Sequence, residues 1–126
     1  MRLTLRDDLI LTDVMVAFQG RQVEVSDMVV DTGSATTMLS ADVAVQIGIV
    51  PESNDALYVI HSIGRTEVVF SRRVDRVQVG PRAIEQMEIE VGGIDAAFHI
   101  NGILGLDVLL PLGAIINLGA LQLDFT

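Results

Sequence analysis

One apolar strand of this sequence ends in a carboxylate at the tip of a predicted turn. The tetrapeptide Asp31-Thr32-Gly33-Ser34 directly follows the apolar run 28–30, and it occurs once in the 126 residues. All four residue types favour turns. A glycine two residues after the aspartate lets a second stretch of backbone come close and lets an N–H reach the carboxylate. We therefore expect a strand that ends in a turn, with the Asp31 carboxylate held at its tip.

Further segments on both sides of this turn form a recognisable order. Upstream, residues 14–23 predict a strand, a turn at Gln19-Gly20 and a second strand. Downstream, residues 102–109 place two apolar residues and a glycine before a predicted short helix, and residues 114–117 and 121–125 read as closing strands. In this order the segments resemble the retropepsin-like aspartic peptidases, single-domain chains that each carry one Asp-Thr-Gly motif.

The resemblance implies a role for each residue of the two signatures. Asp31 is the catalytic residue, Thr32, Gly33 and Ser34 support its loop, and the second signature behind the loop consists of Ile103, Leu104 and Gly105. Thr32 is expected to bond to the loop of a partner chain. Ser34 is expected to donate a hydrogen bond to the outer oxygen of Asp31, which would lower the pKa of the catalytic pair.

The single motif also predicts the assembly. An aspartic peptidase activates water between two carboxylates about 3 Å apart that share one proton, because like charges that close cannot both ionise. One Asp31 per chain therefore implies a homodimeric endopeptidase that hydrolyses a peptide or protein substrate. No metal ion and no cofactor is required for this chemistry.

Between the two signatures the resemblance implies a flap, a hairpin that closes over the substrate. The candidate is the segment 57–69, with Ile63 and Gly64 at its tip and glycine providing a positive φ there. Retroviral flaps contain more glycine than this one. Ala35 is a second departure, because retroviral members place an acidic residue at that position to bind the substrate backbone.

These features also have simpler interpretations. Residues 31–34 taken alone fit an ordinary turn, and Asp107 is expected to cap the short helix rather than to serve as a second acid. The alternative function is a catalytically inactive module that keeps the fold for peptide binding or dimerisation. It is motivated by the hairpin with few glycines and by Ala35.

Composition and charge restrict the class of protein. With 126 residues and 50% hydrophobic residues, the chain fits one domain spanning 1–126 that buries roughly two-thirds of its unfolded surface. The net charge of −9 argues against nucleic acid and anionic membranes as partners. Cysteine is absent, and two histidines, His61 and His99, are too few for a zinc site without carboxylate ligands.

All eight basic residues are arginine. We expect five of them on a solvated face, with pairing to acidic substrate residues or across a dimer as the alternative; these are Arg65, Arg72, Arg73, Arg76 and Arg82.

The sequence predicts no membrane partner and a cytoplasmic location. The first eight residues lack the apolar core of a signal peptide. The apolar stretch 100–123 contains Asp107 and Pro111, which disfavour a membrane-spanning helix. The ends of the chain, 1–5 and 121–126, are strand-like and are expected to pair during assembly.

The expected fold is all-β, with closed or orthogonal barrel-like sheets, one short C-terminal helix and completion as a dimer. A helical turn is also expected at 40–47, with Ser40 as its cap, and the C-terminal helix at about 106–112. Strands are predicted at 9–18, 21–25, 28–30, 57–60, 67–70, 74–79 and 84–91.

Overall fold

The computed structural model describes residues 1–62, 65–94 and 96–126, and of residues 60–62, 65–67 and 96 only the backbone. Its strands are β1 (Thr4–Arg6), β2 (Leu9–Phe18), β3 (Arg21–Val30), β4 (Met38–Leu39), β5 (Tyr58–Ser62), β6 (Arg65–Val79), β7 (Arg82–Gly92), β8 (Gly102–Leu104), β9 (Ala114–Asn117) and β10 (Gln122–Phe125). Its helical segments are α1 (Ala41–Ala44), α2 (Leu106–Leu109) and the 3-10 turns η1 (Val45–Ile47) and η2 (Ala96–Phe98).

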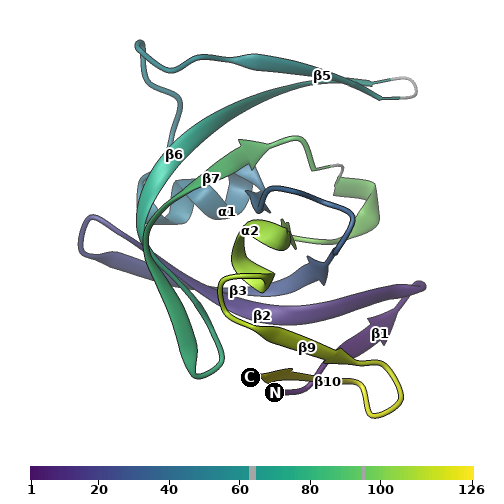
Figure 1. Cartoon of the computed structure of the whole chain (residues 1–126). Coiled ribbons are helices and arrows are strands. Elements are labelled where there is room, and N and C mark those ends of the chain that lie inside the picture. Colours follow the sequence, from purple (N-terminus) through teal and green to yellow (C-terminus); the bar gives the residue numbers. More distant parts are fainter. Residues whose placement is uncertain (63–64, 95) are drawn as a thin grey trace.

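The main sheet closes on itself. Its order is β1-β2-β3-β8-β4-β7-β6-β5, and an additional pairing joins β2 to β6, so that six strands form a ring. Figure 1 shows the long, curved β6 crossing the molecule, with α2 lying inside the bend of the sheet. The prediction of an all-β, barrel-like fold is confirmed.

Strands β2 and β3 form a hairpin whose second strand contains a bulge. Thr12 pairs with Met28 and Val14 with Val25, so Asp13 alone lies opposite the two residues Ser26 and Asp27. Asp27 has φ +56°. The two predicted strands 21–25 and 28–30 are therefore one strand, and the expected break between them is this bulge.

Strand β6 is also longer than predicted. The expected strands 67–70 and 74–79 are parts of one strand, and the polar residues that separate them in sequence remain paired, Arg72 with Ile89 and Arg73 with Glu88. The Arg72 guanidinium lies 5.5 Å from the centre of the Phe70 ring. Arg72 also forms ion pairs with Glu52 and with Asp55, the latter at 2.6 Å. These partners let an arginine whose side chain is only 13% exposed continue the strand.

The two predicted helices are present with adjusted ends. Ser40 caps α1 as expected, because its hydroxyl accepts from the Val43 N–H at 3.2 Å, and η1 then ends at Gly48 with φ +83°. The predicted helix 106–112 ends at Leu109, with Leu110 as its C-cap. Pro111 has no N–H with which to continue the helical bonding.

Buried aliphatic side chains fill the ring. Alternate residues of β2 and β6 point inward, and α2 adds Val108 from within. The core residues on these elements are Val14, Val16, Phe18, Phe70, Val74, Val77, Val79, Val108 and Leu109. Of the charged residues that the structure describes, none is fully buried in this core.

The two ends of the chain lie side by side (Figure 1). Strands β9 and β10 form a hairpin, and the N-terminal residues pair with its β10 strand: the Leu3 N–H donates to the Leu121 carbonyl and the Leu123 N–H to the Met1 carbonyl, both at 2.8 Å. Within one chain, the strand-like ends therefore pair with each other. Among the described residues, no helix is long and apolar enough to cross a membrane.

Candidate active site

Two short strand pairings position the loop 31–37. Strand β8 lies between β3, to which it runs parallel, and β4, to which it runs antiparallel. The chain leaves β3 at Val30, forms the loop 31–37 and returns as β4 on the other side of β8. The second sequence signature therefore lies directly beneath the turn that carries Asp31, as the sequence implied.

Asp31 is half-buried and is the first residue of this loop. Its N–H donates to the Leu104 carbonyl at 3.0 Å, so β8 fixes its backbone. The Gly33 N–H donates to Asp31 Oδ1 at 2.9 Å, so the amide that reaches the carboxylate is that of the glycine itself and not that of a second stretch of backbone. This hydrogen bond sets the orientation of the Asp31 side chain.

The hydrogen bond expected from Ser34 to Asp31 is not formed. The Ser34 hydroxyl donates instead to the Thr36 carbonyl at 2.7 Å, because this acceptor lies two residues further along the same tight loop. Ser34 thus stabilises the loop and not the charge of Asp31. Thr32 is exposed, and its predicted bond to a second chain stays a prediction.

Glycine is required at Gly102, the first residue of β8, and at Gly105, directly after β8. A Cβ on Gly102 would lie 2.5 Å from the Met38 carbonyl oxygen, and one on Gly105 would lie 2.5 Å from that of Thr36. Because both obstacles are backbone, no side-chain rotation could relieve the contact. The close crossing of strands expected at these glycines is present, and it brings Leu104 within bonding distance of Asp31.

Asp107 does not cap α2 as predicted. The N-cap position belongs to Gly105, and the Asp107 carboxylate accepts from Thr37 twice: from the backbone N–H at 2.9 Å and from the hydroxyl at 2.6 Å. Thr37 is buried and also accepts from the Gly105 N–H at 3.0 Å. Sequence reasoning missed Thr37, and its signal was only that a threonine follows the exposed loop where an apolar strand begins.

The hairpin predicted within residues 57–69 is present. Strands β5 and β6 pair from Tyr58 with Val69 to Ser62 with Arg65, and Figure 1 shows the hairpin extending away from the body of the molecule. Its expected tip residues, Ile63 and Gly64, lie outside the described residues. At its base, Tyr58, Val59 and Val68 expose more than half of their surface. The role of this hairpin as a flap stays a prediction.

The five arginines do not share one solvated face. Arg72 is only 13% exposed in its side chain and binds Glu52 and Asp55, and Arg82 donates to the Leu112 carbonyl at 3.0 Å. Arg76 forms an exposed pair with Glu85, and Arg73 is exposed. The interpretation as a solvated face was therefore wrong for Arg72 and Arg82, which stabilise the fold.

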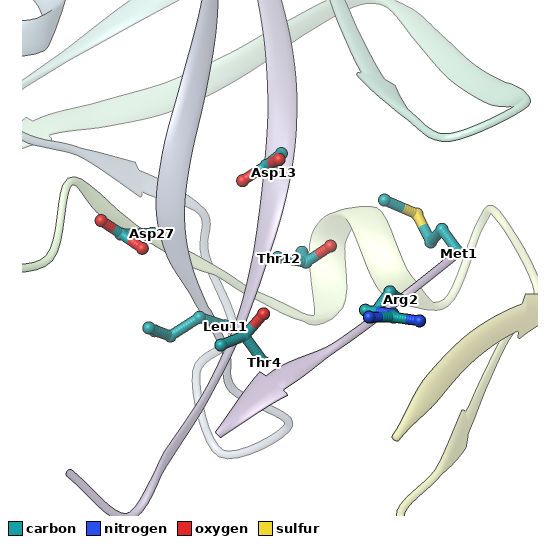
Figure 2. A pocket seen from close by; sticks show the side chains of 7 residues that line it. All are labelled: Met1, Arg2, Thr4, Leu11, Thr12, Asp13 and Asp27. Carbon is teal, nitrogen blue, oxygen red and sulfur yellow. The ribbon is translucent and has the colours of Figure 1, made fainter. Parts of the chain in front are cut away.

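A hollow of about 320 Å³ is lined by Thr12, Asp13, Asp27 and residues near the N-terminus but by none of residues 31–37 (Figure 2). The Thr12 hydroxyl is buried there without a hydrogen-bond partner among the described residues.

In the part of the chain that the structure describes, no group of three or more His, Asp or Glu side chains could hold a metal ion.

Comparisons with known proteins agree with this geometry. The family model for aspartyl proteases matches residues 14–108. No curated protein matches the chain. Among solved structures, a retropepsin-like aspartic protease from Rickettsia conorii has a TM-score of 0.68 and 15% identity, over 98% of this chain and 97% of that one.

Two further solved structures share the fold. The retroviral protease-like domain of Ddi1 from Leishmania major has a TM-score of 0.65 and 20% identity, covering 93% of this chain and 87% of that one. EIAV protease in complex with the inhibitor HBY-793 has a TM-score of 0.59 and 22% identity, covering 89% and 95%. The chain has the retropepsin fold, and it belongs to the aspartyl protease family.

Proposed function

We propose that this chain is a homodimeric aspartic endopeptidase. The observation that supports this most is the position of Asp31: a half-buried carboxylate at a loop tip, fixed by Leu104 beneath it and by the Gly33 N–H beside it. One chain supplies one such carboxylate. Two chains related by a two-fold axis would supply the pair that activates water.

The chemistry follows from a shared proton. Asp31 of one copy, ionised, takes a proton from the attacking water, while Asp31 of the second copy, protonated, donates a hydrogen bond to the carbonyl oxygen of the peptide. The water oxygen bonds to the carbonyl carbon, and a tetrahedral intermediate forms. The C–N bond then breaks as the amine nitrogen accepts a proton from the pair, which releases two peptides.

The second copy requires a free surface, and β9 offers a suitable one. The chain's own N-terminal residues occupy one edge of β10, whereas β9 pairs only with β10 among the described residues. Ile115 on β9 and Leu118 after it are 45% and 63% exposed. Unpaired strand edges with exposed apolar side chains favour association. We propose that the two copies pair through β9, with their N-terminal segments outside.

The substrate is proposed to be an extended peptide that binds between the β5–β6 hairpin and the floor formed by β3 and β8. A peptide in such a groove adds main-chain hydrogen bonds as a further strand would. Val30 and Ile103, both partly exposed on that floor, favour apolar side chains next to the cleaved bond.

Cleavage of a diverse peptide library from acidic to neutral pH tests the activity. We expect cleavage at apolar sites, and a loss of at least about 10³-fold for Asp31→Asn, which keeps the shape but removes the base. Asp13→Asn, on an exposed carboxylate of β2, is the matched control and keeps activity. Cleavage that persists in Asp31→Asn contradicts the assignment; no cleavage by a stable dimer supports the inactive binding module instead.

Sedimentation at varied concentration tests the assembly. Leu118→Asp places a charge at the proposed interface and is expected to weaken the dimer, and activity is expected to fall in parallel. Val45→Asp, a similarly exposed valine on the distant 3-10 turn, is the control. Equal dimer affinity for Leu118→Asp and the wild type would rule out pairing through β9.

A further inference from the structure

We propose that Asp107 is a positioning residue of the active site, acting through Thr37 to hold the Asp31 loop in its reactive geometry. The inference rests on the proposed peptidase function and deepens it. Asp107 does not approach the reacting atoms, and its effect would be transmitted through the loop 31–37.

The contact uses both oxygens of the carboxylate. Asp107 Oδ2 accepts from the Thr37 N–H at 2.9 Å and Oδ1 accepts from the Thr37 hydroxyl at 2.6 Å, across 70 residues of sequence. Hydrogen bonds to an ionised acceptor are shorter and about twice as strong as neutral ones. Thr37 is 3% exposed, so water does not compete for these donors.

Thr37 is bonded at each of its polar atoms. Its hydroxyl also accepts from the Gly105 N–H at 3.0 Å, and its carbonyl accepts from the Glu90 N–H at 3.0 Å. A residue held in this way has one backbone position and one side-chain rotamer. The C-terminal end of the Asp31 loop is therefore fixed to β7, β8 and α2 at the same time.

The same short segment fixes the rest of the loop. The Asp31 N–H donates to the Leu104 carbonyl at 3.0 Å, and the Leu106 N–H donates to the Ser34 carbonyl at 2.8 Å. Residues 104–107 thus hold the loop at its start, middle and end. Between these points Thr32, Gly33, Ala35 and Thr36 are exposed and lack the support of a core. The links at Thr37 are formed by the side chains of Asp107 and Thr37, so they can be removed without changing the backbone.

Loss of the hydrogen bonds between Asp107 and Thr37 is expected to lower the rate of catalysis more than the affinity for the substrate. Two Asp31 carboxylates must lie within a few tenths of an ångström of their shared-proton geometry, and a displacement of about 1 Å can cost about 10²-fold in rate. The pairing of the proposed floor strands β3 and β8 with each other does not include Thr37. The expected signature is a lower kcat with a nearly unchanged KM.

The test uses Thr37→Val, which keeps the shape and removes the hydroxyl, and Thr37→Ser, which restores it. In the dimeric protein with a cleaved peptide, Thr37→Val and Asp107→Asn are each expected to lower kcat by about 10- to 100-fold with KM within about 3-fold. Thr37→Ser retains most of kcat. Because the two residues act as a unit, the double variant is expected to be little worse than the more affected single variant.

Three controls separate this proposal from simpler effects. Glu24→Gln, on an exposed carboxylate of β3, should leave kcat unchanged. The dimer dissociation constant of each variant is measured, and it should not move. Amide hydrogen exchange at Asp31 and Leu106 should accelerate in Thr37→Val but not in Glu24→Gln.

The outcomes are distinct. An unchanged kcat in Thr37→Val and Asp107→Asn, additive losses in the double variant, or a loss explained by dimer dissociation would overturn the role of Asp107. If the wild-type dimer cleaves no peptide, the peptidase proposal fails by itself, and the exchange measurement still decides whether Asp107 and Thr37 position the loop.

Discussion

Two threonines are buried to the same degree, and their surroundings differ completely. Thr37, 3% exposed, joins the Asp31 loop to α2 through Asp107 and Gly105, whereas Thr12, 4% exposed, has a hydroxyl without a partner among the described residues. Figure 2 shows Thr12 on β2, with its hydroxyl directed toward the space beside the N-terminal segment. Burial alone therefore does not mark a functional polar residue.

The difference lies in what each hydroxyl does for the backbone. At Thr37 the bonds connect segments 70 residues apart and fix the loop that carries Asp31. At Thr12 the neighbouring bulge of β3 has moved the partner strand away from regular register. We infer that the Thr37 hydroxyl positions the loop and that the Thr12 hydroxyl contributes little to stability. The four substitutions below test this contrast, in order of decreasing loss of stability.

Gly105→Ala should have the largest effect on stability, because the added Cβ would displace the backbone next to Thr37. Its Cβ would lie 2.5 Å from the Thr36 carbonyl oxygen, so the loop or α2 must move. We expect a loss of about 3 kcal/mol in the free energy of unfolding, measured by urea denaturation. The control is Gly119→Ala, where the nearest atom is 3.5 Å away. Equal stability of the two variants would show that the backbone at Gly105 can accommodate a Cβ.

Thr37→Val is expected to cost about 2 kcal/mol of unfolding free energy, because it leaves one Asp107 oxygen and the Gly105 N–H without their buried partner. Thr37→Ser should recover at least half of this loss. The same denaturation series measures both variants. If Thr37→Val is as stable as the wild type, the Asp107–Thr37 hydrogen bonds do not contribute to the free energy of unfolding.

Arg72→Met should cost about 1.5 kcal/mol and, unlike Thr37→Val, should depend on salt. The ion pair with Asp55 is nearly buried, with side-chain exposures of 13% and 14%, whereas Glu52 is 55% exposed and contributes less. Arg73→Met, on the neighbouring exposed residue, is the control. We expect the Arg72 effect to shrink between 0.05 and 1 M salt, on the order of a few tenths of a kcal/mol. An effect that ignores salt would point to packing on Phe70 instead.

Thr12→Val should be neutral or stabilising by up to about 1 kcal/mol, since it replaces an unpartnered buried hydroxyl by a methyl group of the same size. Thermal unfolding of Thr12→Val beside Thr37→Val makes the comparison direct. A loss comparable to that of Thr37→Val would show that the Thr12 hydroxyl has a partner in solution, for example water held in the adjoining hollow.

Local sequence patterns correctly predicted those segments whose structure depends on interactions between residues close together in sequence. The strand 9–18 and the Ser40 cap were predicted at their observed positions, because alternation and capping are short-range signals. The bulge at Ser26-Asp27 and the polar stretch at Arg72 each interrupted a pattern without ending the strand. Their continuity depends on residues far away in sequence.

The candidate site shows the same division. The position of Asp31 at a loop tip was predicted from a motif of three residues, and the close crossing at Gly102 and Gly105 from the resemblance to the family. The hydroxyl of Ser34 was assigned to the wrong acceptor, since a carbonyl two residues away competes with the carboxylate. The Asp107–Thr37 contact could not be predicted, because only the fold brings α2 beneath the loop.

The most direct test of the account is the distance between the two Asp31 carboxylates in a crystal structure of the protein at the concentration where it associates. The account predicts a two-fold dimer with carboxylate oxygens about 3 Å apart, the separation at which two acids share one proton. A dimer that keeps the two Asp31 side chains more than about 6 Å apart, or a chain that stays monomeric, would contradict it.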